Sequence, residues 1–189
     1  MIKIVIMISS RGSNMLAIAN NVKNGKLKNI CEIQTVFSNN ENAPGLRKAE
    51  NLNIPTYSIS SKGKKKHSYN LALLEWLKVQ NPDFIILAGY MKILPVEIIR
   101  LFPRRIINIH PADTTQHQGL DGYKWAWKNE LKKTKISVHY VDEGLDTGEI
   151  IDQQIVDLRD AENLEEVVQL GLKMEHEFYS ECLRKVFSR

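Results

Sequence analysis

The feature that most constrains the fold is a regular alternation of short apolar runs with stretches of helical period. The apolar runs have the length of strands and lie at Lys3–Ile8, Glu32–Phe37, Thr56–Ser60, Phe84–Ala88 and Arg105–Ile109. Such alternation is typical of βαβ units around a mostly parallel sheet. We therefore expect an α/β fold, a three-layer sandwich with helices on both faces of a Rossmann-like sheet.

Three stretches of helical period lie between or after these runs. The first carries apolar residues on one face, at Met15, Ile18, Ala19 and Val22. We expect Ser13 or Asn14 to cap this helix and Gly25 to end it. A second helix is expected from about His67 to Gln80, and a third from about Leu164 to Val186.

The pattern changes in the last third of the chain. Two strand-like runs, Ile136–Val141 and Glu149–Val156, are joined by the acidic, Gly-containing loop Asp142–Gly148. A short connection joins antiparallel neighbours, whereas parallel strands need a longer crossover. We expect this pair to extend the sheet with at least one added antiparallel strand.

Length and charge limit the classes of protein to consider. With 189 residues, 43% of them hydrophobic, the chain is long enough for one domain with a substantial core, and we expect residues 1–189 to form it. The net charge of +4 and the pI near 9.0 suit a small anionic partner such as a phosphate or a polycarboxylate. The positive excess is too small to predict nucleic-acid binding.

The chain has no predicted membrane segment. Its first apolar run, 1–9, is far too short to span a bilayer and lacks the cleavage pattern of a signal peptide. Cys31 and Cys182 have no metal-like spacing to the histidines. We therefore expect a cytoplasmic protein with no membrane contact and no structural disulfide.

Three polar side chains follow two of the predicted strands. Asn108 and His110 lie where an apolar strand stops, and Asp146 lies in the loop between the last two strands. Catalytic groups in open α/β sheets gather at such strand ends. An amide, an imidazole and a carboxylate together suit the stabilisation of an oxyanion, and a nearby carboxylate would favour charged His110. The alternative is that His110 only satisfies backbone groups at the strand end.

Three further features suggest binding sites. The turn Ser9–Asn14 directs backbone N–H groups and a helix dipole toward the space above the sheet, which suits a phosphate, although Ser13 could simply cap the helix. Gly89 and the segment 91–94 suit a flat ligand, or form a plain strand-to-helix turn. Glu175 falls on the apolar face of the last helix, where a carboxylate should have a reason, such as capping a neighbouring element or pairing with a buried lysine.

Seven short motifs, in order, resemble the folate-dependent formyltransferase family, especially its purine-synthesis branch. They are Gly12–Asn14, Val36–Asn39, Leu87–Leu94, Asn108–Pro111, Ser137–Val141, Leu145–Gly148 and Glu175–His176. The resemblance covers nearly the whole chain. It implies transfer of the formyl group of 10-formyltetrahydrofolate to the amine of 5-phosphoribosylglycinamide, by a monomer or homodimer without a metal.

The resemblance also assigns roles to residues. Residues 1–105 would form the phosphate-binding half, and residues 106–189 the catalytic half with the C-terminal helix. The acceptor, phosphoribosylglycinamide, would be held by Gly12, Ser13, Asn14 and Glu175. The folate would contact Lys66, Met91, Lys92, Ile93, Leu94 and Asn108. In catalysis, Asn108 and protonated His110 would stabilise the oxyanion, and Asp146 would support His110 and relay a proton through water.

One loop departs from the family's usual pattern. After His110-Pro111 the family continues with Ser-Leu-Leu-Pro, whereas residues 112–118 here are mostly polar and include Asp113. Asp113 either binds a cationic or hydroxyl-rich acceptor or caps the turn, which aspartates commonly do. The departure keeps three alternatives open: another amine acceptor such as a nucleotide sugar, formyltetrahydrofolate hydrolysis, and a non-catalytic folate- or nucleotide-binding protein.

The remaining histidines and the lysine-rich segment are assigned no catalytic role. We expect His139 to be structural or to support the site from a neighbouring strand, and His67 and His117 to lie on the surface. The run 62–66, which contains four lysines, reads as a solvated loop.

Overall fold

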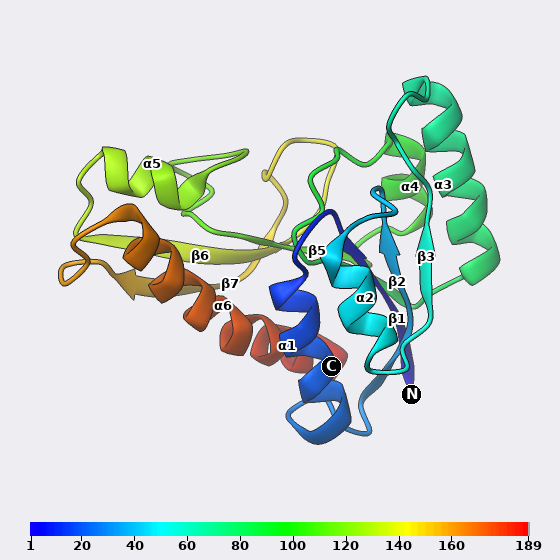
Figure 1. The fold of residues 1–189 in the computed structure, drawn as a ribbon, viewed down its shortest axis with the longest axis horizontal. Coiled ribbons are helices and arrows are strands. Elements are labelled where there is room, and N and C mark those ends of the chain that lie inside the picture. The colour runs from blue at the N-terminus through cyan, green and yellow to red at the C-terminus, as the bar shows by residue number, and fades with distance from the viewer. Residues whose placement is uncertain (189) are drawn as a thin grey trace.

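A computed structural model describes residues 1–188, which form a seven-stranded mixed sheet in the order β3-β2-β1-β4-β5-β6-β7 (Figure 1). The strands are β1 (Ile2–Ile8), β2 (Cys31–Ser38), β3 (Thr56–Ser58), β4 (Phe84–Leu87), β5 (Ile106–His110), β6 (Lys133–Tyr140) and β7 (Ile150–Asp157). Strands β1 to β5 are parallel, β6 is antiparallel to β5, and β7 is antiparallel to β6. The predicted mostly parallel sheet with an antiparallel extension is confirmed.

Helices cover both faces of this sheet. They are α1 (Ser13–Asn24), α2 (Pro44–Glu50), α3 (Lys66–Gln80), α4 (Val96–Leu101), α5 (Gly122–Lys128) and α6 (Leu164–Phe187). Ile4, Ile6 and Ile8 of β1 pack in one core cluster with α1, α2, α5 and α6, whereas Val5 and Met7 pack in another with α3 and α4. Successive strand residues point to opposite faces, so one apolar run fills two core layers.

The strand order reverses between β1 and β4. From β1 the chain moves outward to β2 and β3, then returns to add β4 on the other side of β1. The loops after β1 and β4 diverge at such a point and leave a crevice, the usual place for a ligand in an open α/β sheet. Ser9 N donates to Gly89 O (3.0 Å) and Ser9 Oγ accepts from Met91 N (2.8 Å), which ties the two loops together at the crevice.

Helix α6 is tied to the sheet by a polar contact. The fully buried Tyr179 hydroxyl lies within hydrogen-bonding distance of the carbonyl oxygens of Leu87 (3.1 Å), the last residue of β4, and Ile107 (2.9 Å), the second residue of β5. A buried hydroxyl must find an acceptor, so this bond fixes the helix against the two strands that end at the crevice. Ile107 immediately precedes Asn108, and the contact therefore also fixes the strand end that carries the predicted catalytic residues.

The structure differs from the sequence-based prediction in several elements. Helices α2, α4 and α5 were not predicted, and they have seven, six and seven residues. The predicted cap of the first helix was wrong, because Gly12 is the cap residue and α1 has no side-chain capping bond. Gly12 adopts a left-handed conformation (φ 65°) and packs closely on Gly45, where an added Cβ would lie 3.0 Å from the Gly45 Cα. Only glycine fits this turn without strain.

Two findings bear on membrane and redox chemistry. Within residues 1–188, no helix is long and apolar enough to cross a membrane. Cys31 and Cys182 are both buried free thiols, and burial raises the pKa of each to about 12. Neither thiol has the exposed, acidic character of a reactive cysteine.

The Tyr179→Phe substitution is expected to lower the free energy of unfolding by about 1–3 kcal/mol, because it leaves buried carbonyl oxygens without their donor. Urea denaturation measures the change. Tyr57→Phe serves as the control, since Tyr57 is 45% exposed on the edge strand β3. Equal stabilities for the Tyr179 variant and the unmodified protein would contradict the anchoring role.

Candidate active site

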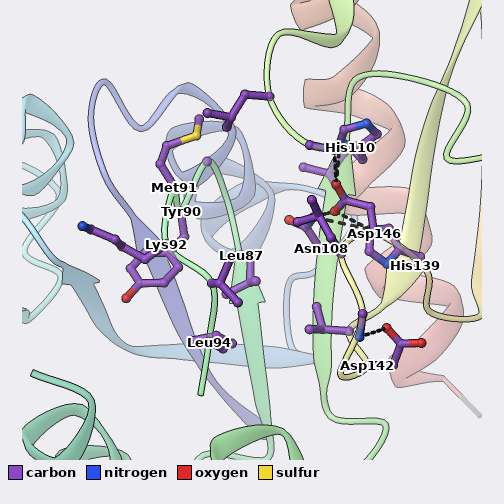
Figure 2. A pocket seen from close by; sticks show the side chains of 18 of the residues that line it. Leu87, Tyr90, Met91, Lys92, Leu94, Asn108, His110, His139, Asp142 and Asp146 are labelled. Carbon is purple, nitrogen blue, oxygen red and sulfur yellow. Dashed lines mark hydrogen bonds and ion pairs between the residues drawn. The ribbon is translucent and has the colours of Figure 1, made fainter. Parts of the chain in front are cut away.

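The three predicted catalytic residues meet at the carboxyl end of β5. Asn108 and His110 belong to β5, and Asp146 lies in the loop between β6 and β7, with a left-handed backbone (φ 52°). Asp146 Oδ2 is 3.4 Å from His110 Nδ1, and Asp146 Oδ1 is 3.3 Å from Asn108 Nδ2. Figure 2 shows the three side chains converging on one point. The grouping predicted from sequence is present.

His110 is held between two acceptors. Its Nδ1 faces the Asp146 carboxylate and its Nε2 lies 3.1 Å from the carbonyl oxygen of His117, so only the charged ring satisfies both. Burial nevertheless lowers the pKa of His110 below its ordinary value, although Asp146 and the His117 carbonyl raise it. The carboxylate favours the charged ring, as expected, but burial outweighs it because the residue is only 3% exposed. His110 is therefore a weak base that can gain a proton when negative charge forms beside it.

Asp146 is the anionic centre of the cluster. Burial raises its pKa, but contacts with His139, the Gly119 N–H and His110 outweigh burial and leave the pKa below its ordinary value. The Gly119 N–H donates to Asp146 Oδ2 at 2.9 Å. Asp146 is thus ionised at neutral pH and can accept a proton during a reaction.

His139 belongs to this site, which sequence reasoning did not establish. The antiparallel register of β5 and β6 places it directly opposite Asn108. Its Nε2 lies 3.4 Å from Asn108 Nδ2 and 3.5 Å from Asp146 Oδ1, while its Nδ1 donates to the Tyr140 carbonyl at 2.9 Å. The Asn108 amide therefore donates to the Asp146 carboxylate through a long bond and lies beside the His139 ring, and an incoming anion can displace this bond.

An open cavity of about 430 Å³ leads to this cluster. Figure 2 shows Leu87 and the segment Tyr90–Leu94 along the wall opposite Asn108 and His110. Ile99, Pro111, Leu120, Val141 and residues 142–145 complete most of the lining. Two apolar side chains at the rim of the cavity, Met91 and Ile93, are 59% and 72% exposed. A largely apolar cleft with polar groups at one wall suits a flat ring system carrying a reactive polar atom.

Five of the six residues predicted to contact the flat ligand line this cavity, and one does not. Met91, Lys92, Ile93 and Leu94 form its wall, as does Asn108. Lys66 is absent from the lining and is exposed at the first position of α3. The wall is connected to that helix, since the hydroxyls of Tyr69 and Tyr90 share a 2.6 Å hydrogen bond.

Glu175 and the predicted phosphate turn are also brought together. Asn14, in the first turn of α1, donates from Nδ2 to Glu175 Oε2 at 2.5 Å, and the Asn14 Oδ1 is buried with no hydrogen-bond partner. The other Glu175 oxygen accepts a bond from the Tyr123 hydroxyl. Burial raises the pKa of Glu175, which is 5% exposed. The alternative of a buried lysine partner was wrong.

Tyr123 was missed by sequence reasoning. It lies in the short helix α5 and reaches Glu175 across Gly171 of α6, where an added Cβ would be 2.0 Å from the tyrosine ring. A signal was available in the sequence, because a glycine on the apolar face of a long helix often marks close packing of another element.

The divergent loop does not place its acidic residue in the cavity. Asp113 Oδ1 accepts bonds from Thr115 N (3.1 Å) and Thr115 Oγ1 (2.8 Å), which confirms the predicted turn cap. His117 was expected on the surface but is only partly exposed. Its ring stacks on Trp125, with centroids 4.9 Å apart, and its carbonyl accepts from His110.

Within residues 1–188, no group of three or more His, Cys, Asp or Glu side chains is arranged to hold a metal ion.

Comparisons with known proteins agree with one another. The family described as formyl transferase matches residues 2–183. Phosphoribosylglycinamide formyltransferase of Bacillus subtilis (strain 168) is 30% identical over 185 residues, which are 97% of this chain and 94% of that protein. The trifunctional purine biosynthetic protein adenosine-3 of Drosophila pseudoobscura pseudoobscura is 35% identical over 92% of this chain, which spans 13% of that protein. The crystal structure of phosphoribosylglycinamide formyltransferase from Bacillus halodurans superposes with a TM-score of 0.92 at 31% identity, covering 99% of this chain and 96% of that one.

Asp146→Asn is expected to lower the pKa of His110 further, because the Asp146 carboxylate is the main group that raises it. An NMR titration of the histidine ring signals measures the change, with the spectrum of His110→Ala to identify the signal. Asp142→Asn in the same loop is the control, since Asp142 accepts bonds from Gly144 and Thr147 within its own turn. A His110 pKa that stays the same or rises in Asp146→Asn would refute this electrostatic account.

Proposed function

The chain belongs to the formyl transferase family, and on that basis we propose that its cavity transfers the formyl group of 10-formyltetrahydrofolate to the amine of 5-phosphoribosylglycinamide. The observation that carries the proposal is the meeting of Asn108, His110 and Asp146 at one wall of an apolar cavity. The fold similarity to phosphoribosylglycinamide formyltransferases supports the choice of acceptor.

The reaction needs stabilisation of an oxyanion. The uncharged amine attacks the formyl carbon and produces a tetrahedral species whose oxygen carries negative charge. Asn108 offers an amide N–H, and His110, once protonated, offers a positive charge beside it. Preorganised donors of this kind lower a barrier by roughly 2.7–4 kcal/mol each. Burial keeps the His110 pKa low in the resting site. Negative charge that forms on the tetrahedral species favours protonation of the ring, and the charged ring then stabilises that species.

The proton of the attacking nitrogen must be removed and delivered to the leaving group. Asp146 is ionised and half-buried beside His110, so it accepts this proton, directly or through a water molecule. The C–N bond to the folate nitrogen then breaks, and that nitrogen takes up the proton. The protons and charges of this reaction therefore balance without a metal or a redox group.

We propose that the folate ring lies against the wall formed by Met91, Lys92, Ile93 and Leu94. Apolar side chains and backbone groups at this wall suit the recognition of a flat heterocycle. The carboxylate tail of the folate would extend out of the cavity toward Lys66, which is exposed outside the lining.

The acceptor is proposed to lie across the crevice between β1 and β4. Its phosphate would rest on the turn of Gly12 and Ser13 at the start of the 12-residue helix α1, where backbone N–H groups and the helix dipole favour an anion. The glycinamide end would reach Asn14 and Glu175, and the unpaired Asn14 Oδ1 supplies an acceptor for its N–H groups. A cytoplasmic location and a monomer or homodimer belong to the same proposal.

A second candidate is formyl transfer to a different amine. The observation that favours it is the occupation of Glu175 by Tyr123 and Asn14, which leaves fewer lone pairs for an amine from the substrate. Both candidates use the same donor and the same catalytic residues, and they differ only in the acceptor.

Purified protein is expected to consume a 10-formylfolate donor only when phosphoribosylglycinamide is present, measured by absorbance. Replacing Asn108 or His110 with alanine should reduce kcat by about 10²–10³-fold, because each change removes an oxyanion-stabilising group. Donor consumption without the nucleotide would instead indicate hydrolysis. Turnover only with another amine would favour the second candidate, and donor binding without turnover would favour a binding protein.

Removal of the acceptor's 5-phosphate is expected to raise KM far more than it lowers kcat. The phosphate turn lies away from the reacting atoms, so its contacts stabilise the bound substrate and the transition state equally. Steady-state kinetics with glycinamide riboside and its 5-phosphate make the comparison. Equal KM values for the two acceptors would exclude a phosphate site at Gly12 and Ser13.

A further inference from the structure

We infer that Asp113, Lys135, Ser137 and Gln153 form a loop anchor that positions both His110 and Asp146 for the reaction. The inference rests on the proposed function for its kinetic part, and on geometry alone for its structural part. None of the four residues lines the cavity. They are positioning residues, because they act through the loop 111–119 and do not touch the reacting atoms.

The anchor is a connected polar network beneath the divergent loop. Lys135 Nζ of β6 lies 2.8 Å from Asp113 Oδ2, and it donates to Gln153 Oε1 of β7 at 3.2 Å. Gln153 Nε2 donates in turn to Ser137 Oγ (2.9 Å) and Asp113 Oδ1 (3.3 Å), and Ser137 Oγ donates to the Ala112 carbonyl (2.8 Å). The loop is therefore bonded to two strands through both backbone and side chain.

The position of Asp113 is transmitted directly to the catalytic groups. Its carbonyl accepts from the backbone N–H groups of Gln116 and His117, both at 2.9 Å, which closes a single tight turn. The carbonyl of His117 then holds His110 Nε2 (3.1 Å), and the N–H of Gly119 holds Asp146 Oδ2 (2.9 Å). One loop thus supplies a contact to each of the two catalytic residues through residues 117 and 119. Asp113 fixes the start of the same loop.

The charge on Asp113 opposes displacement of the loop. The residue is 5% exposed, and a buried carboxylate without a cation would be strongly disfavoured. Burial raises its pKa, but the bonds from Lys135, Thr115 and Gln153 lower it to about 2. A displaced loop would leave the carboxylate without the ammonium of Lys135, so displacement is opposed by electrostatics as well as by hydrogen bonding.

His110 has charged or titratable neighbours on every element packed against it. They are Asp146 from the β6–β7 loop, His139 from β6 and His117 from the anchored loop. The contact with the His117 carbonyl fixes the proton on Nε2 and raises the pKa of His110. Loosening the loop removes this contact, so the ring should lose both its fixed tautomer and part of its basicity.

The test uses two single variants, the double variant and a matched control. Asp113→Asn removes the charge but retains the acceptor for Thr115, and Lys135→Met removes the cation at a side chain that is 40% exposed and tolerant of change. The control is Asp157→Asn, since Asp157 also has a pKa near 2 and also caps a turn, at Arg159, but is exposed at the end of β7. The amount of folded protein in each sample is measured by thermal unfolding.

Each single variant is expected to lower kcat per folded enzyme by about 10- to 100-fold, the effect of a small misplacement of catalytic groups. KM for both substrates should change less than threefold, and the double variant should lose no more than the worse single variant. In ¹⁵N NMR of the histidine rings, both variants should shift the His110 pKa downward and mix its tautomers, while Asp157→Asn changes none of these readouts.

Unchanged kcat per folded enzyme together with an unchanged His110 titration, in either single variant that folds, would overturn the inference. A loss of stability alone would do the same, because a purely structural network lowers the folded fraction and not the rate per folded site. If the unmodified protein shows no formyl transfer but the His110 signal still shifts, the proposed function fails and the positioning role stands.

Discussion

The half-buried negative charge of Asp146 is the constraint around which the site is arranged. A carboxylate withdrawn from water needs donors or cations, and four come from separate parts of the chain: the amide of Asn108, the rings of His110 and His139, and the Gly119 N–H. Strands β5 and β6 bring the first three together through their register, and the loop after β5 brings the fourth. The sheet topology therefore places donors around this carboxylate before any substrate is bound.

Burial and hydrogen bonding act against each other at three ionisable groups, His110, Asp146 and Glu175. At His110, burial prevails and lowers the pKa. Hydrogen bonds and nearby imidazoles prevail at Asp146 and keep it ionised. Burial prevails again at Glu175, despite bonds from Tyr123 and Asn14. His110 and Asp146 both line the cavity, where their lowered pKa values favour a neutral imidazole beside an ionised carboxylate, so the two groups can hold and release protons separately.

Much of the fold was predictable from the sequence, because apolar residues that recur regularly over a long stretch identify a helix or strand. The strands and the helices α1, α3 and α6 agree with the prediction within a few residues, whereas α2, α4 and α5 are too short to have a clear period. The trio at the end of β5 was found because strand ends in parallel sheets share an edge. His139 and Tyr123 were not assigned to sites, since their roles depend on cross-strand register and helix packing that no local pattern encodes. Asp113 was correctly assigned as a cap. Its bond to Lys135 joins segments distant in sequence, so no local pattern predicts it.

The close packing of Tyr123 on Gly171 has a consequence for how such chains can change. The ring occupies the volume that a side chain at position 171 would need, and its hydroxyl reaches Glu175 only because that volume is empty. A larger residue at 171 would push the aromatic ring away and release the carboxylate, whereas a smaller residue at 123 would open space beside α6. Substitutions at the two positions are therefore expected to be coupled, because the place of the Tyr123 ring and its bond to Glu175 both depend on the volume left empty at position 171.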